Sequence, residues 1–110
     1  MWKPTGVSLN SLAPGGKIGV DLADRTLLLV RLGATVHALD GICTHEGGIL
    51  ANGELHGLRI ICPEHQANFD VTSGTVLADP DGIEPPTGTI GPLTRYPTRA
   101  VGGMVEVDLP

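Results

Sequence analysis

The sequence is short of aromatic side chains, of cysteine and of long apolar runs. Tryptophan, tyrosine and phenylalanine occur once each among 110 residues, so a core must be built mainly from valine, leucine, isoleucine and alanine. The aliphatic stretch 27–30 is far too short to cross a bilayer, which takes about 20 apolar residues. The chain also begins without a hydrophobic signal region. We therefore expect one soluble, cytoplasmic domain spanning residues 1–110, with no membrane partner.

Basic residues are scarce as well. Seven lysines and arginines face twelve aspartates and glutamates, which gives a net charge of −5. Residues 43–84 hold seven of the acids and a single base, Arg59, while the rest of the chain is close to neutral. Such a charge argues against a nucleic acid partner, because phosphates would be repelled. The acidic half is either an ordinary solvated surface or a docking face for a basic partner protein, and we favour the docking face.

Sixteen glycines and nine prolines favour a turn-rich, all-β chain over a helical one. Residues 17–23 alternate apolar with polar or small residues, as a half-buried strand does, whereas residues 26–32 are nearly all apolar and are expected to lie centrally. The pair Asn52-Gly53 predicts a left-handed turn, and Gly102-Gly103 predicts a primed hairpin turn. Further strands are predicted at residues 7–9, 35–40, 58–61, 69–71, 74–77, 93–101 and 104–109.

The two cysteines each stand close to a histidine. Cys43 and His45 are separated by one residue, Cys62 and His65 by two, and sixteen residues lie between the pairs. Thiolate and neutral imidazole are strong ligands for soft or borderline metals, and tight spacing lets one loop offer both. The alternative reading is two unrelated buried cysteines with ordinary surface histidines. Two such pairs favour a single metal site instead.

The identity of the metal is left open by ligand count. A Cys2His2 set fits zinc, although zinc fingers usually pair cysteine with cysteine and histidine with histidine. Here each loop mixes the two residue types. Mixed pairs fit a two-iron centre in which one iron takes both cysteines and the other takes both histidines.

Two motifs carry a resemblance to Rieske-type [2Fe-2S] ferredoxins. Residues 43–50, CTHEGGIL, match C-x-H-x-G-x-x-L, and residues 62–70, CPEHQANFD, match C-P-x-H-x-x-x-F-D. Residues 36–40, 93–97 and 104–107 resemble the flanking strands of that family. The resemblance implies an antiparallel β-sandwich with an inserted cluster-binding subdomain of two loops, at about residues 41–84. It also implies a proline-containing loop, residues 79–92, folded over the site.

The resemblance further implies one [2Fe-2S] cluster per chain. Cys43 and Cys62 would bind one iron, and His45 and His65 the other. Histidine ligation makes the addition of an electron less costly than it is with four thiolates, and it therefore raises the midpoint potential. Across the class this potential lies at about −150 to +300 mV. No catalytic residue is implied.

The chain departs from its apparent family at several positions. Gln66 stands where glycine is usual, and Glu64 where many relatives carry tryptophan or cysteine. Where high-potential relatives place hydroxyls against the sulfurs, this sequence has Ala67 and Phe69. Their loop-to-loop disulfide is also missing, since Gly48 and Glu64 occupy those positions. We therefore predict a midpoint potential at the low end of the range.

The sequence thus predicts an electron-transfer protein rather than an enzyme. It would be a soluble ferredoxin that carries single electrons from a reductase to a terminal oxygenase or another redox enzyme. One alternative is a small Rieske subunit of a larger oxidoreductase complex. The other is a zinc-binding interaction domain, which metal analysis would distinguish.

Overall fold

The structure is a computed structural model that describes residues 1–44 and 47–110. Within these residues the chain is all-β, with three antiparallel sheets and three short 3-10 turns, so the predicted fold class is confirmed. No helix in the described part is long and apolar enough to cross a membrane. The sheets have the orders β1-β11-β10, β2-β3-β4-β9 and β5-β6-β7-β8.

The strands of the first sheet are β1 (Trp2–Ser8), β10 (Thr98–Val101) and β11 (Met104–Asp108). Those of the second are β2 (Lys17–Leu22), β3 (Arg25–Leu32), β4 (Thr35–Asp40) and β9 (Arg95–Tyr96). Those of the third are β5 (Glu54–His56), β6 (Arg59–Ile61), β7 (Asn68–Asp70) and β8 (Val76–Ala78). The 3-10 turns are η1 (Leu9–Ser11), η2 (Leu50–Asn52) and η3 (Pro80–Gly82).

Strand β3 separates two hydrophobic cores. Successive side chains of a strand point to opposite faces. Leu27 and Leu29 accordingly pack in a core shared with the first sheet, while Leu28 and Val30 pack in a core shared with the third sheet. All four are fully buried. This explains why the run is continuously apolar rather than alternating, and it confirms the central position predicted for it.

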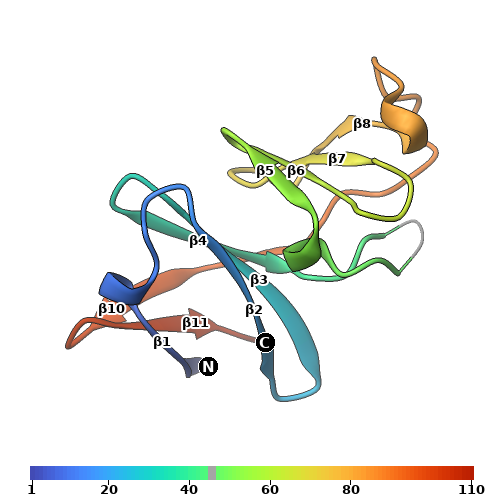
Figure 1. The fold of residues 1–110 in the computed structure, drawn as a ribbon. Coiled ribbons are helices and arrows are strands. Elements are labelled where there is room, and N and C mark those ends of the chain that lie inside the picture. The colour runs from blue at the N-terminus through green and yellow to red at the C-terminus, as the bar shows by residue number, and fades with distance from the viewer. Residues whose placement is uncertain (45–46) are drawn as a thin grey trace.

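The third sheet is an insertion between β4 and β9, which are neighbours in the second sheet. Figure 1 shows strands β5 to β8 as a separate lobe above the body formed by the other strands, with both termini in that body. The inserted part was predicted as two loops, with strands at residues 58–61, 69–71 and 74–77. Strands β6, β7 and β8 overlap these ranges, β5 was not predicted, and the second of the two loops lies between β6 and β7.

The predicted strand 93–101 is in fact two strands in different sheets. Proline has no backbone N–H to give to a sheet. Strand β9 pairs with β4 and ends before Pro97, and β10 then pairs with β11. The following hairpin turn has positive φ at both Gly102 and Gly103, as predicted. The first strand is longer than predicted, since it begins at Trp2 instead of residue 7.

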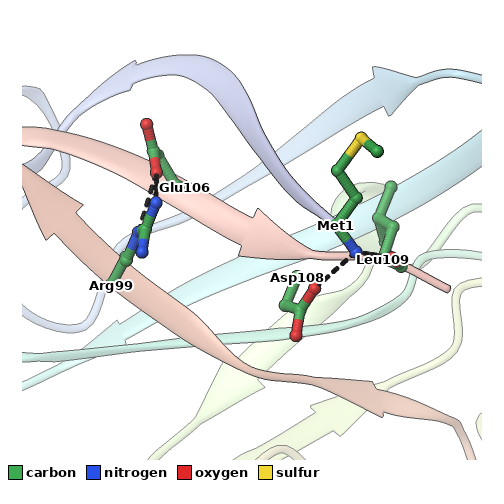
Figure 2. A network of polar contacts seen from close by, with 5 residues as sticks. All are labelled: Met1, Arg99, Glu106, Asp108 and Leu109. Atoms are coloured by element: carbon green, nitrogen blue, oxygen red, sulfur yellow. Dashed lines mark hydrogen bonds and ion pairs between the residues drawn. The ribbon is translucent and has the colours of Figure 1, made fainter.

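The two ends of the chain are tied together at the edge of the first sheet (Figure 2). The N-terminal amine of Met1 donates to Asp108 Oδ1 at 2.7 Å and to the carbonyl of Leu109. Arg99 forms an ion pair with Glu106 at 2.8 Å on the same sheet. These contacts lie in the body, so they support the fold but do not reach the inserted lobe.

The Asn52-Gly53 pair does not make the left-handed turn that the sequence predicts. Gly53 has φ −83° and ψ −178°, which any residue adopts. Glycine is required there for a different reason, because a Cβ would lie 1.9 Å from the carbonyl oxygen of Ile61. The close approach of two chain segments, and not a turn conformation, accounts for this residue.

Candidate metal centre

The first loop leaves β4 and returns to η2. Gly41 N–H donates to Thr26 and its carbonyl accepts from Leu50 at 2.9 Å, which anchors both ends of the loop on the body. Inside the loop, Cys43 N–H donates to the carbonyl of Gly48 at 2.8 Å, and Gly47 N–H donates back to the carbonyl of Cys43 at 3.2 Å. His45 and Glu46 lie outside the described residues.

The second loop, between β6 and β7, repeats this pattern. Cys62 N–H donates to the carbonyl of Ala67 at 2.8 Å, and Gln66 N–H donates back to the carbonyl of Cys62 at 3.0 Å. The fifth residue of each loop has a left-handed backbone, with φ 71° at Gly47 and 60° at Gln66. The two loops therefore have the same backbone design. The comparison also shows why glycine would suit position 66.

The two cysteines meet between the loops. Both are buried free thiols. Burial raises the pKa of the Cys62 thiol, and the adjacent Cys43 thiol raises this pKa further. The backbone N–H groups of Glu64 and His65 hydrogen-bond to the Cys62 sulfur and act in the opposite direction. Paired thiols with backbone donors aimed at sulfur are a donor set that fits a bound metal or iron–sulfur group.

The histidines are placed less completely. His65 is exposed on the second loop, and its carbonyl accepts from Asp81 N–H at 2.5 Å. The prediction for His45 falls outside the described residues. Among the residues that are described, no three histidine, cysteine, aspartate or glutamate side chains are gathered closely enough to hold one metal ion. The structure thus brings the two predicted cysteines together and puts His65 at the exposed end of the same loop as Cys62.

The surroundings of the sulfurs are apolar. Ala67 and Phe69 are both fully or almost fully buried, in the same core as the two cysteines and Leu50. Neither side chain has a hydroxyl to donate to sulfur. Residues 63–66 are exposed, so the cysteine side of the site is shielded from solvent and the rim formed by the second loop is open to it. A shallow groove of about 360 Å³ opens beside Cys62 on this rim.

Residues 79–92 contact both loops. Besides the bond from Asp81 to the second loop, the hydroxyl of Thr44 in the first loop donates to the carbonyl of Gly91 at 2.8 Å. Asp79, at the start of the segment, is buried and accepts two hydrogen bonds from Thr87. Sequence reasoning missed Asp79, because a single acid after a short strand carries no periodic signal. The departure at Gln66 was noted from the sequence, and the structure adds its left-handed backbone.

The remaining histidines are not part of this centre. His56 is exposed and paired with Glu54 at 2.9 Å. His37 lies on β4, where burial and then the charge of Arg95 lower the pKa of its imidazole.

Comparison with known proteins gives consistent results. The family model described as "Rieske [2Fe-2S] domain" matches residues 3–96. The naphthalene 1,2-dioxygenase system ferredoxin component of Pseudomonas putida is 35% identical over 103 residues, covering 94% of this chain and 91% of the relative. The corresponding component of Pseudomonas aeruginosa is 31% identical with the same coverage.

A solved structure gives the same result for the fold. The ferredoxin of carbazole 1,9a-dioxygenase from Nocardioides aromaticivorans IC177 superposes with a TM-score of 0.85. It is 26% identical to this chain, and the match covers 100% of this chain and 99% of that one.

Proposed function

The chain belongs to the Rieske [2Fe-2S] domain family, and we propose that it carries single electrons from a reductase to a terminal oxygenase or another redox enzyme. The observation that carries the proposal is the meeting of two buried cysteines between two loops of identical hydrogen-bond pattern. The relatives named above are ferredoxin components of dioxygenase systems, which are electron-transfer proteins and not catalysts.

We infer that Cys43 and Cys62 hold one iron of the cluster, and that His45 and His65 hold the other. A bound [2Fe-2S] cluster supplies reversible one-electron chemistry. The chain contributes buried thiol ligands, backbone N–H donors near the Cys62 sulfur, and an apolar surround that excludes water. The exposed position of His65 supports an electron exit on the histidine side of the centre.

The surroundings of Cys62 support a low midpoint potential. Hydroxyl donors to sulfur stabilise the extra negative charge of the reduced state, and the buried Ala67 and Phe69 side chains offer none. Glu64 adds a negative charge on the rim, but it is exposed and therefore screened by water and salt. We expect a midpoint toward the low end of the class range of about −150 to +300 mV.

A potentiometric EPR titration of the purified protein tests cluster type and midpoint together. The expected result is one rhombic Rieske signal that appears with a single one-electron midpoint. Iron and acid-labile sulfide analysis on the same sample tests the zinc alternative. Zinc without sulfide would contradict the proposal.

The ligand assignment has its own test. His65→Ala and His45→Ala are expected to abolish the native visible and EPR spectra, whereas His56→Ala is the matched control outside the two motifs. Retention of the native spectrum in either ligand variant would remove that histidine from the centre.

The exposed rim around the loops is our proposed docking face. It carries Glu64, Asp81 and Glu84, and it includes the exposed side chains of Ile49 and Ile83. Exposed apolar side chains together with exposed acids fit a partner with a basic face, and the charge would speed the encounter. No nucleic acid is expected there.

The cytoplasmic location predicted from the sequence stays a prediction, and cell fractionation tests it.

We also propose that residues 1–110 act as a single domain with a cluster-binding subdomain at about residues 41–84. Strand β11 lies beyond the matched residues 3–96, yet it pairs with β1 and β10. The segment 85–92, which follows that boundary, still contacts the first loop at Gly91. Limited proteolysis that releases no stable fragment would support this unit.

A small subunit of a larger complex is the second candidate. The exposed apolar rim residues fit a permanent interface as well as a transient one. Purification of the native protein at its natural abundance distinguishes the two, because a subunit would co-elute with its complex. A zinc domain is disfavoured, since the family model of a Rieske [2Fe-2S] domain matches residues 3–96.

A further inference from the structure

The two loops of the centre have no covalent link between them, because both cysteines are free thiols. Each loop closes on itself through the backbone bonds described above. Each also bonds separately to residues 79–92. Asp81 N–H donates to the carbonyl of His65 at 2.5 Å, and the Thr44 hydroxyl donates to the carbonyl of Gly91 at 2.8 Å. This segment, the bridging segment, therefore joins the two loops.

A bridge holds two loops in place only if its own ends are fixed. Residues 81–89 are exposed, so the bridging segment has little core of its own. Asp79 is the exception, with only 6% of its surface exposed. Its Oδ2 accepts from Thr87 N–H at 2.9 Å and from the Thr87 hydroxyl at 2.7 Å. Its backbone N–H also donates to Ile83, and its carbonyl accepts from Gly82.

A second contact on the bridging segment is weaker. Glu84 pairs with Arg59 at 2.8 Å, and Arg59 also donates to Asn68. The Glu84 side chain is 50% exposed and that of Arg59 34% exposed. Exposed ion pairs contribute little, whereas hydrogen bonds to a buried carboxylate are among the stronger ones. Asp79 is thus the main polar fixed point of residues 79–89, while Ile90, near the far end of the bridging segment, packs against the core that holds both cysteines.

We propose that Asp79 is a positioning residue that, through Thr87, holds the bridging segment against both loops and keeps the His65 loop in its ligating conformation. Only the claim that this conformation lets His65 bind the cluster rests on the proposed function. The mechanical part, a buried carboxylate that orders a loop ten or more residues away in sequence, follows from the hydrogen bonds alone.

Hydrogen bonding rather than charge performs this role. Both bonds from Thr87 reach the same oxygen, and Asp79 Oδ1 has no hydrogen-bond partner among the described residues. An asparagine side chain would keep an oxygen for Thr87 and place its NH2 group where Oδ1 lies. Asp79→Asn should therefore preserve the arrangement, and Asp79→Ala should not.

Hydrogen–deuterium exchange on the full, metal-loaded chain tests the proposal. In Asp79→Ala we expect about tenfold faster exchange in peptides covering the bridging segment and residues 62–67, because two bonds to a buried carboxylate are lost. Asp79→Asn should retain most of the protection. Glu84→Gln is the matched control and should stay near the wild type. Peptides from β3 should not change in any variant.

Two results would overturn the proposal. One is faster exchange confined to the bridging segment, with residues 62–67 unaffected. The other is faster exchange everywhere, β3 included, which would mean general destabilisation. If Asp79→Ala does not fold, Thr87→Val removes one bond and leaves the carboxylate in place. It should give the same pattern with a smaller increase in exchange rate.

The EPR spectrum adds a measurement that general stability does not move. In Asp79→Ala the displaced His65 loop should change the g values of the reduced protein. In Asp79→Asn the g values should stay close to those of the wild type. The exchange pattern does not depend on which metal is bound. A zinc-loaded chain would therefore refute the proposed function and still decide the role of Asp79.

Discussion

Gly48 packs so closely on Cys62 that a Cβ at residue 48 would lie 2.9 Å from the Cys62 sulfur. It would also lie 2.7 Å from Cγ of Glu64. The returning end of the first loop thus rests directly on the second loop. Gly48 has no positive φ, so its backbone would accept any residue. The space between the loops, and not the backbone, requires glycine here.

Gly48→Ala is expected to lower cluster incorporation, because the new methyl group must push the Cys62 sulfur away from the Cys43 sulfur. Overpacking of this kind costs about 1–3 kcal/mol. Visible absorbance and iron per chain in freshly purified protein measure the effect. Gly91→Ala is the matched control, since a Cβ there meets nothing within 4 Å and φ is not positive. Equal loss of iron in both variants would contradict the packing argument.

The backbone conformation of Gln66 predicts how substitutions at this position change the stability of the protein. Its φ of 60° is left-handed, which costs a residue other than glycine roughly 1–2 kcal/mol. Gln66→Val should destabilise the protein by about 1 kcal/mol more, because β-branched side chains fit this region worst. Gln66→Gly should be neutral or slightly stabilising, since relief of strain is offset by the entropy of glycine in the unfolded chain. Thermal unfolding of the loaded protein measures both. A marked loss in Gln66→Gly would show that the side chain itself is needed.

The part of the centre that could be predicted from the sequence is the part where chemistry requires particular residues, and the ligand set stays a prediction. The two Cys/His motifs identified both loops, and the structure brings Cys43 and Cys62 together. What it missed depends on contacts between distant segments. The role of Asp79 follows from Thr87 and from its burial, and neither leaves a trace in a local pattern. The placement of His45 stays a prediction.

The same distinction holds for the fold. Residues 26–32 were predicted to be central because they are nearly all apolar, and the fully buried residues 27–30 of β3 confirm this. Residues 93–101 were predicted as one strand, because nothing local shows that Pro97 marks a change of sheet. Gly53 looked like a turn residue and is instead a point of close approach to Ile61. Periodicity reports one strand at a time, whereas these features need the partner segment.

Ala67→Ser should raise the midpoint potential. Ala67 is buried beside Cys62, whose N–H its carbonyl accepts, so a hydroxyl there can donate to sulfur. One added hydrogen bond that favours the reduced state by about 1.4 kcal/mol corresponds to about 60 mV for one electron. Ala38→Ser is the control, because Ala38 is a fully buried alanine on β4 in the core shared with the first sheet, apart from the core that holds both cysteines. Potentiometric titration of both measures the shift, and an equal rise in the control would argue against a bond to sulfur.

Tyr96 predicts a pH-dependent contribution to stability. Its hydroxyl donates to Asp40 Oδ1 at 2.6 Å and accepts from Arg25 at 2.8 Å, just before the first loop. Burial, and then Asp40, raise the pKa of Tyr96 above 10.0. Tyr96→Phe should therefore lower the free energy of unfolding by about 1–2 kcal/mol at neutral pH.

The pH dependence has a definite sign. Below the unfolded pKa of 10.0 the Tyr96 hydroxyl is protonated in both states, so its bond to Asp40 contributes fully. As the pH rises from there through the folded pKa, the unfolded chain releases this proton first, and the contribution is lost. Urea unfolding should show the wild type and Tyr96→Phe converging above about pH 10. A difference that stays constant across this range would assign the effect to packing of the ring.

The exposed acids of the proposed docking face, called the acidic rim below, predict salt-dependent electron transfer to a basic protein. Glu64 and Asp81 are exposed on the second loop and the bridging segment, whereas Asp24 is exposed in the turn between β2 and β3, in the body of the fold. Basic cytochrome c is a suitable acceptor, because a low-potential centre can reduce it. Glu64→Gln with Asp81→Asn should slow its reduction several-fold at low ionic strength and flatten the dependence on salt, since charge steering acts on the encounter. Asp24→Asn should leave the rate unchanged. Equal slowing by Asp24→Asn would show that net charge, and not the acidic rim, governs the encounter.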